Sequence, residues 1–331
     1  MLSLLGLDPA DYAPSALHHP DRTFRETNCY VDIWIELLHT IGQEPLAALP
    51  FTFAVDFEGD QWTFFKFPLA DLASLYGIEV FELNVWRPLL AHIEEQLTLG
   101  RPAIVEVDGF HLPDTAGTAY QCEHVKTSIA VQALDRAGRG LGYFHNAGYH
   151  ELEGSDFAGV FRLDESETDA THLPPYVEIA KLPVRFPRSG RSLAAASLDL
   201  LSIHLARRPD DNPFERYATR FHDDLAWLAG QPLAQFHRYA FATLRQCGAA
   251  FELGAAYLRW LQTSGESGLD RIADTCDIIA TTAKTLQFKT ARVAAANRPL
   301  DPAPMLHTMA TAWDEVMAEL TARYGALAPQ G

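Results

Sequence analysis

The sequence is poor in cysteine, in basic residues and in long apolar runs, and each shortage excludes a class of protein. The four cysteines, at positions 29, 122, 247 and 276, show no paired spacing. This argues against a disulfide framework and a CxxC metal site, and it fits a reducing cytoplasm. No apolar stretch reaches the roughly 18 residues of a membrane span, and the first residues lack the basic segment of a signal peptide. We therefore expect a cytoplasmic protein that has no membrane partner.

Basic residues are too few for a nucleic-acid-binding protein. The chain has 26 Lys and Arg against 43 Asp and Glu, a net charge of −17, whereas nucleic-acid binding depends on basic surface. The deficit is uneven, because residues 1–189 carry 12 basic and 28 acidic residues, a balance of −16, and residues 190–331 carry 14 and 15, a balance of −1. Such asymmetry predicts two domains, 1–189 and 190–331, with different surfaces.

The most informative stretch that is present runs from Thr23 to Gly42. Its apolar residues after Cys29 recur at helical spacing, namely Val31, Trp34, Ile35, Leu38 and Ile41. Thr27 or Asn28 can cap this helix, which places Cys29 in the first turn. Unpaired backbone N–H groups and the positive end of the helix dipole favour a thiolate there. Cys29 is therefore a candidate nucleophile, and its alternative role is that of a small buried hydrophobic residue.

The remainder of the first domain predicts an α+β fold. Residues 1–22 look like a loosely structured arm, and 49–67 reads as two β runs around a turn at Glu58–Asp60. Helical periodicity covers 69–76 and 86–99, the second ending at Gly100 as a C-cap. Strands are expected at 102–107, 125–134 and 141–145. The helix that begins at Cys29 thus comes first and antiparallel strands follow, which is an α+β layout.

The second domain predicts an all-α bundle. A proline-punctuated connector spans 164–190, and every later segment has helical spacing. The expected helices cover residues 192–208, 213–229, 232–263, 268–296 and 302–324. Asn212 is expected to cap the helix 213–229 and Asp301 the helix 302–324, and each of these two helices has a proline directly after its cap.

His124 and Asn146 are the candidate partners of Cys29. His124 lies 95 residues after Cys29 and directly precedes a predicted strand. Asn146 lies 22 residues after His124, at the end of the next predicted strand. Adjacent antiparallel strands place such ends side by side, so Asn146 is expected to orient the imidazole of His124 towards the thiol. His145 competes with Asn146 for the orienting role. Cysteine, histidine and asparagine in this order are the nucleophile, base and orienter of a papain-like enzyme.

Two other clusters have simpler interpretations. The four residues Cys122, His124, His145 and His150 are of the types that bind zinc, but their spacing matches no familiar structural site, so no metal is expected. The acids Asp56, Glu58 and Asp60 are expected to serve the predicted turn.

A resemblance supports the cysteine-enzyme interpretation. The run VEVDGFHLPDTAGTAYQCEHVKTSIAVQALD resembles the N-terminal domain of the butirosin-biosynthesis acyltransferase family, which has a papain-like, peptidase-C39-like fold. The matching positions are Val107, Asp108, Phe110, Leu112, Pro113, Tyr120 and His124. The family's cysteine matches Cys29, and its Asp or Asn after the next strand matches Asn146.

A second resemblance covers the entire chain. RETNCYVDIWIELLH, DFEGDQWTFFKF and GYFHNAGYHEL look like a bacterial family encoded near amino acid:carrier-protein ligases. The sequence departs from the papain-like pattern six residues before the cysteine, where Thr23 replaces the glutamine of the oxyanion hole. The hole is expected to use the Cys29 N–H together with Thr23 or Asn28, with Tyr120 as a supporting residue.

These resemblances imply cysteine-dependent acyl transfer. Cys29 takes an acyl or aminoacyl group from the phosphopantetheine arm of a carrier protein, and passes it to a small-molecule or peptide amine. No tightly bound cofactor is needed. A thioesterase or cysteine hydrolase with the same triad, and a non-catalytic carrier-protein-binding module, are the alternatives. Because the first domain is acidic, the carrier is expected to dock on basic residues of the connector and second domain, among them Arg188, Arg191, Lys289 and Arg292.

Overall fold

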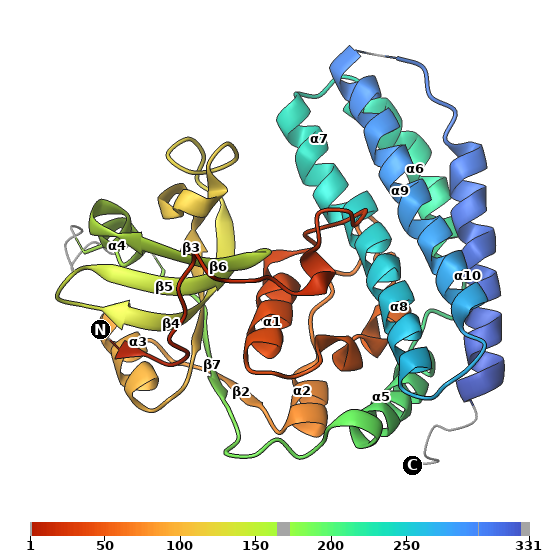
Figure 1. The fold of residues 1–331 in the computed structure, drawn as a ribbon. Coiled ribbons are helices and arrows are strands. Elements are labelled where there is room, and N and C mark those ends of the chain that lie inside the picture. Colours follow the sequence, from red (N-terminus) through yellow and green to blue (C-terminus); the bar gives the residue numbers. More distant parts are fainter. Residues whose placement is uncertain (1, 164–172, 297, 326–331) are drawn as a thin grey trace. The chain divides into compact units, whose positions relative to one another are not determined.

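The computed structural model describes residues 2–163, 173–296 and 298–325 (Figure 1). The chain divides into two compact units that interleave in sequence. The first comprises Met1–His19, Asn28–Glu44 and Leu72–Pro187, and the second Pro20–Thr27, Pro45–Asp71 and Arg188–Gly331. The units therefore differ from a single division after residue 189, because two segments of the N-terminal half belong with the C-terminal helices.

The first unit contains a seven-stranded antiparallel sheet. Its strands are β1 (Leu2–Ser3), β2 (Glu79–Glu82), β3 (Ala103–Asp108), β4 (Lys126–Asp135), β5 (Gly140–His145), β6 (Gly148–Glu153) and β7 (Val177–Lys181). The order is β2-β7-β3-β4-β5-β6, and β1 pairs with β4. The three predicted strands are β3, β4 and β5. The prediction of a connector over 164–190 is wrong where β7 forms, and its residues 164–172 lie outside the described residues.

Helices cover both faces of this sheet. They are α1 (Cys29–Thr40), α3 (Leu89–Thr98) and α4 (Gly154–Val160), and α2 (Leu69–Tyr76) precedes β2. The core on the α3 and α4 face combines helix and strand residues, including Leu90, Ile93, Phe157, Val160, Val105, Val131 and Tyr143. Side chains alternate along β7, so that Val177 joins this core and Glu178 accepts a hydrogen bond from Tyr30 of α1 at 2.7 Å. The helix that begins at Cys29 thus packs on the opposite face.

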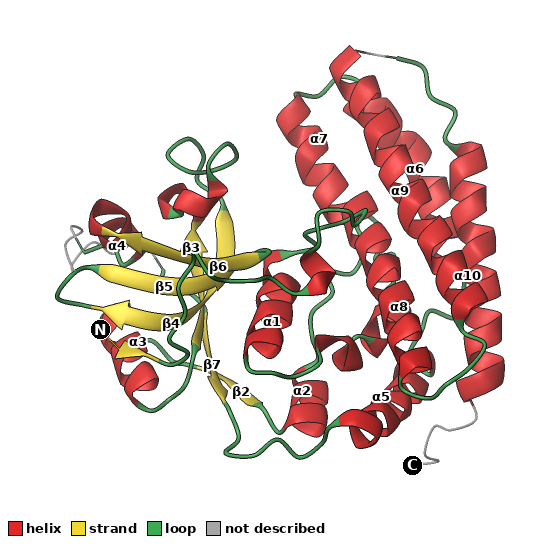
Figure 2. Ribbon diagram, in the orientation of Figure 1, coloured by secondary structure: helices red, strands yellow, loops and turns green. Residues whose placement is uncertain are grey.

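The second unit is a helical bundle whose described residues include no strand of the sheet, and in Figure 2 its helices are red like all helices of the protein. Its helices are α5 (Gly190–Leu205), α6 (Pro213–Leu228), α7 (Leu233–Ala240), α8 (Gln246–Thr263), α9 (Asp270–Ala296) and α10 (Ala303–Tyr324). The capping prediction for α6 is confirmed, since the Asn212 side chain accepts from the Phe214 N–H. The predicted helix 232–263 is divided by a π-helical turn at Phe241–Arg245.

The predicted hairpin over 49–67 is wrong for most of its length. Short 3-10 turns occupy Pro45–Ala48 and Pro50–Ala54, and the β pairing of this segment is a single bridge between Phe57 and Trp62. Prolines at the start of both turns fix helical φ angles and remove a ladder donor, which disfavours a strand. Except for the exposed Phe64, the aromatic residues that suggested strands are buried in the helical unit instead.

Candidate active site

Cys29 is the first residue of α1, as predicted. The Asn28 side chain accepts a hydrogen bond from the Val31 N–H at 3.0 Å, so Asn28 rather than Thr27 caps the helix. The thiol is partly exposed, whereas its neighbours Val31 and Ile33 are completely buried. A partly exposed thiol beside the free N–H groups of a helix N-terminus has access to a substrate and a favourable field for its thiolate.

His124 is bonded to Asp108, which the sequence analysis named as part of the matching run but did not predict as a catalytic residue. His124 Nδ1 lies 2.5 Å from Asp108 Oδ2, and the imidazole stacks on Phe110 with ring centroids 4.5 Å apart. The histidine side chain is 73% exposed. A carboxylate at Nδ1 keeps the proton on that nitrogen and leaves Nε2 as the basic one. The pair is therefore arranged as a base with its orienting acid.

Backbone hydrogen bonds hold the carboxylate of Asp108 in addition to its contact with the imidazole. The carboxylate accepts hydrogen bonds from the backbone N–H groups of Phe110 at 3.0 Å and Val125 at 3.2 Å. Partial burial tends to raise the pKa of Asp108, but these bonds and the one to His124 outweigh it and lower the pKa. Asp108 consequently stays ionised, as an orienting group must.

Asn146 lies at the predicted end of β5 but contacts His124 through no hydrogen bond among the described residues. The pairing of His145 with Gly148 leaves Asn146 in the two-residue turn between β5 and β6, where its φ of 46° suits such a turn. The imidazole of His124 is bonded to Asp108 of β3 instead, and Asn146 remains a prediction as orienter.

A pocket of about 480 Å³ opens beside the His124–Asp108 pair. Glu106 and Lys126, joined by a 2.8 Å ion pair, form part of its wall. Apolar lining comes from residues that include Leu89, Val107, Val160 and Phe161. Cys29 is not among the lining residues. The pocket has the size of a small-ligand site, with the imidazole at its polar side.

His145 belongs to a different, buried cluster. Its Nδ1 lies 2.5 Å from Asp114 Oδ2, and its Nε2 lies 2.8 Å from the Thr127 hydroxyl. Asp114 also accepts from Tyr143 at 2.6 Å. Burial tends to raise the pKa of Asp114, yet the contributions of His145, His150 and Tyr143 together outweigh it and lower the pKa. These contacts tie the loop before His124 to the sheet, so His145 has a partner other than His124.

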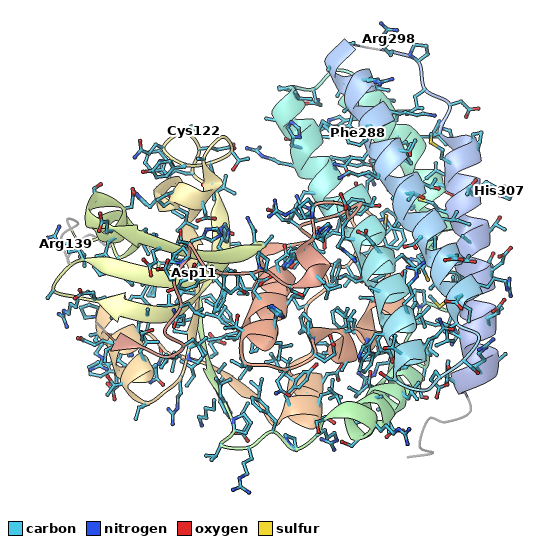
Figure 3. All side chains as sticks on the ribbon, in the orientation of Figure 1. Asp11, Cys122, Arg139, Phe288, Arg298 and His307 are labelled. Atoms are coloured by element: carbon cyan, nitrogen blue, oxygen red, sulfur yellow. The ribbon has the colours of Figure 1, made fainter. Side chains whose placement is uncertain are left out.

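The zinc alternative is not supported by the placement of its residues. Cys122 lies on the exposed loop between β3 and β4 (Figure 3), where its thiol donates to the Thr118 carbonyl. His124 and His145 are bound to different aspartates. Within residues 2–163, 173–296 and 298–325, no three Cys, His, Asp or Glu side chains are grouped to hold a metal ion.

The predicted supporting residues have specific partners. The Thr23 N–H donates to Glu252 at 2.9 Å, so this donor is already used. Tyr120 donates to Asp156 at 2.9 Å, which raises the pKa of its phenol. Thr23 belongs to the second unit and Tyr120 to the first.

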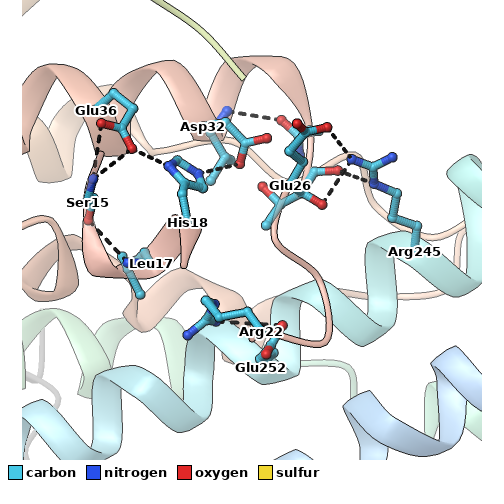
Figure 4. A network of polar contacts seen from close by, with 12 residues as sticks. Ser15, Leu17, His18, Arg22, Glu26, Asp32, Glu36, Arg245 and Glu252 are labelled. Carbon is cyan, nitrogen blue, oxygen red and sulfur yellow. Dashed lines mark hydrogen bonds and ion pairs between the residues drawn. The ribbon is translucent and has the colours of Figure 1, made fainter. Parts of the chain in front are cut away.

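A buried polar network beneath α1 was missed by the sequence analysis. The ring of His18 contacts Glu36 through Nδ1 and lies 3.3 Å from Asp32 through Nε2 (Figure 4). Tyr12 and the Ser15 N–H also donate to Glu36. These contacts order the N-terminal arm, which the sequence had suggested to be loose. Its one available signal was a pair of acids, at positions 32 and 36, on an otherwise apolar helix.

The four residues predicted to bind a carrier lie in the second unit. Lys289 and Arg292 are exposed on α9, three residues apart. Arg191 is exposed in the first turn of α5, and Arg188 is half-buried just before it. Their surface positions allow the predicted role, which needs accessible charge.

Comparison with known proteins gives two matches that together span most of the chain. Residues 13–182 match the model of the DUF1839 N-terminal domain, and residues 190–322 match that of the DUF1839 C-terminal domain. No curated protein matches the chain. No helix among the described residues is long and apolar enough to cross a membrane.

Proposed function

The chain belongs to the DUF1839 family, and we propose that it is a cysteine-dependent acyltransferase whose first unit is a papain-like catalytic domain. One observation carries this proposal: Cys29 is the partly exposed first residue of a capped helix that packs on an antiparallel sheet. The helix N-terminus supplies N–H donors and a positive field both for the thiolate and for the oxyanion that develops on a bound thioester.

The reaction proceeds in two balanced steps. The Cys29 thiolate attacks the thioester carbonyl of an acyl or aminoacyl carrier protein, and the pantetheine thiol leaves with the proton that His124 took from Cys29. An acceptor amine then attacks the acyl-cysteine and loses its proton to His124, and the Cys29 thiol is regenerated. Asp108 keeps the basic Nε2 of His124 free throughout. Exchange between thioesters is nearly isoenergetic and amide formation is downhill, so no nucleotide is consumed.

Hydrolysis is the second candidate, and a specific observation favours it. The His124 side chain is 73% exposed, so water has access to the base. A thioesterase uses the same first step and replaces the amine by water in the second. Exclusion of water from the acyl-enzyme distinguishes transfer from hydrolysis.

Intact-mass spectrometry tests the proposal. The full-length protein is incubated with carrier proteins loaded with different amino acids, and a mass increase equal to the acyl group is expected, with none for Cys29→Ala. Addition of candidate amines then gives an amide product if the enzyme is a transferase, whereas release of free acid without amine identifies a hydrolase. A carrier that binds but never loads Cys29 would contradict both and leave a non-catalytic binding module.

A further inference from the structure

A cationic pocket of about 220 Å³ lies within the second unit, and none of its residues takes part in the proposed acyl transfer. It is lined by Phe24, Arg25, Glu26, Arg245, Lys284 and Gln287. Of the charged groups in this lining, Arg245 lies 3.8 Å from the Glu26 carboxylate, so this carboxylate is already opposed by one cation. The ammonium of Lys284 adds a further positive charge to the same pocket, in a protein whose overall charge is −17.

The wall of this pocket is rigidly built. Glu252 accepts hydrogen bonds from two backbone N–H groups at the start of segment 23–27, at 2.9 and 2.8 Å. Arg245 donates to two carbonyl oxygens at the end of the segment, both at 2.9 Å (Figure 4). Gly248 lets the Phe24 ring lie against α8, since a Cβ there would stand 2.5 Å from the ring. Segment 23–27 is thus hydrogen-bonded at both ends, which fixes the shape of the pocket before a ligand binds.

Lys284 and Gln287 have polar atoms in this pocket with no hydrogen bond or ion pair among the described residues. The Lys284 ammonium lies 4.6 Å from the ring centroid of Phe24 and 5.6 Å from that of Phe288, and no described carboxylate is within ion-pair distance of it. Burial and the nearby Arg245 lower the pKa of Lys284, as expected where positive charge is incompletely neutralised. The Gln287 Oε1 atom is buried and accepts no hydrogen bond among the described residues. Rotation of this amide turns its NH₂ donor to the same position.

We propose that this pocket binds a phosphate group. The Lys284 ammonium supplies a point charge, Arg245 retains its Nη1 group beyond the two bonds that hold segment 23–27, and a turned Gln287 amide adds neutral donors. The phosphate is either that of a pantetheine arm or that of another small phosphorylated ligand. Assignment to pantetheine rests on the proposed function, and it is favoured because segment 23–27 leads directly into Asn28 and Cys29. Phosphate binding itself is independent of that function.

Calorimetric titration of the full-length protein tests this site with inorganic phosphate, coenzyme A and pantetheine, which lacks phosphate. We expect phosphate and coenzyme A to bind, and pantetheine to bind at least tenfold more weakly than coenzyme A. Lys284→Met should weaken phosphate and coenzyme A binding at least tenfold, and Lys284→Arg should retain most of it. Arg298→Met is the matched control, because Arg298 is an exposed cation of the same unit, outside the pocket and apart from the residues proposed to bind a carrier.

The results separate this site from the proposed activity. Unchanged phosphate binding in a folded Lys284→Met variant, or no binding of phosphate and coenzyme A by the wild type, would overturn the pocket whether or not Cys29 is acylated. Binding of phosphate but not coenzyme A would assign the pocket to another phosphorylated ligand. Phosphate binding that depends on Lys284 without any acylation of Cys29 would support the pocket and refute the acyltransferase.

Discussion

The two units use their ionisable side chains in different ways. In the first unit, three histidines are each bonded to a carboxylate, in the groups His18 with Asp32 and Glu36, His124 with Asp108, and His145 with Asp114. In the second unit, His204 and Asp71 form such a pair, at 2.7 Å, and buried cysteines lie in α8 and α9. Among the described residues, histidine–carboxylate contacts are thus more frequent around the sheet than in the bundle.

This contrast suggests a division of labour. Proton transfer needs a base held in the correct tautomer, and a histidine bonded to a carboxylate provides one. Recognition of an anionic partner needs charges that stay fixed, which arginine and lysine provide. Under the proposed function, the chemistry falls to the first unit and anion recognition to the second, and variants in each unit should fail in different ways.

The thiols give the largest expected difference between the units. Cys29→Ala should remove acyl loading, a loss of roughly 10³-fold or more, because no other group in the site is nucleophilic. Cys247→Ala should leave loading intact. Iodoacetamide near pH 7 should modify Cys29 first, ahead of exposed Cys122, while burial raises the pKa of Cys247 and Cys276 and shields both. Peptide mass mapping over time measures these rates.

Equal labelling of Cys29 and Cys122 in the folded protein would remove the evidence for an activated thiolate. Labelling of Cys247 or Cys276 before unfolding would show that the bundle opens readily, and would end the contrast between a reactive unit and an inert one.

Substitution of the base, His124, or of its orienting residue, Asp108, should give the next largest loss of loading rate. His124→Ala should lower the rate of loading by roughly 10²- to 10⁴-fold. Asp108→Asn should cause a loss close to that of His124→Ala, since an amide reverses the preferred tautomer. Asn146→Ala should cost much less, because no hydrogen bond joins it to His124 among the described residues. Single-turnover loading measured against pH resolves the three variants. A larger loss in Asn146→Ala than in Asp108→Asn would restore the arrangement inferred from sequence.

The stability of the first unit should depend on His18. Burial opposes its protonation, but hydrogen bonds to Asp32 and Glu36 raise the pKa of His18 to about 9. A raised pKa stabilises the fold fully below the unfolded value of about 6.5, and this stabilisation is lost as the pH rises through 9, by on the order of 3 kcal/mol. Denaturant unfolding should therefore show lower stability at pH 10 than at pH 7.

The matched variants are His18→Gln in the first unit and His204→Gln in the second. The first should be less stable at pH 7 and should lose the His18 share of the decline between pH 7 and pH 10. The share from Cys247, Cys276 and the buried tyrosines, whose pKa values burial raises, should remain. The second variant should retain the whole decline. An unchanged decline in His18→Gln would place the titrating group elsewhere.

The bundle was largely predictable from sequence because its signals are local. Asn212 followed by Pro213 marks the start of α6, and the apolar spacing of α9 and α10 extends over many turns. The interruption at Phe241–Arg245 was not predictable, because one extra residue in a helical turn hardly changes the hydrophobic pattern.

The sheet and the site were only partly predictable because their contacts join distant residues. Strand β7 pairs with β2, almost 100 residues earlier, so its short sequence carries no local turn signal. Asp108 meets His124 because Asp108 pairs with Lys126 in the β3–β4 register, and that register exists only in the assembled sheet. The helix start at Cys29, which depends on a neighbouring cap, was predicted correctly.

The smallest expected effect concerns the surface charge of α9. Lys289 and Arg292 are exposed, three residues apart, on the unit whose charge is nearly balanced. Carrier proteins are typically acidic, and the acidic N-terminal half should repel them, so these two cations should speed encounter. Lys289→Glu combined with Arg292→Glu should slow loading from a carrier protein several-fold at low salt, because exposed charges act mainly on association rates.

Three controls make this last prediction specific. The effect should shrink near 1 M salt, where the screening length falls to about 3 Å. Exchange of the two cations, Lys289→Arg with Arg292→Lys, should preserve the rate. Loading from a small pantetheine thioester should be unaffected, since that donor needs no docking surface. Equal losses with both donors would mean that the substitutions disturb the fold or the chemistry, and the carrier would then have to dock on a surface other than α9.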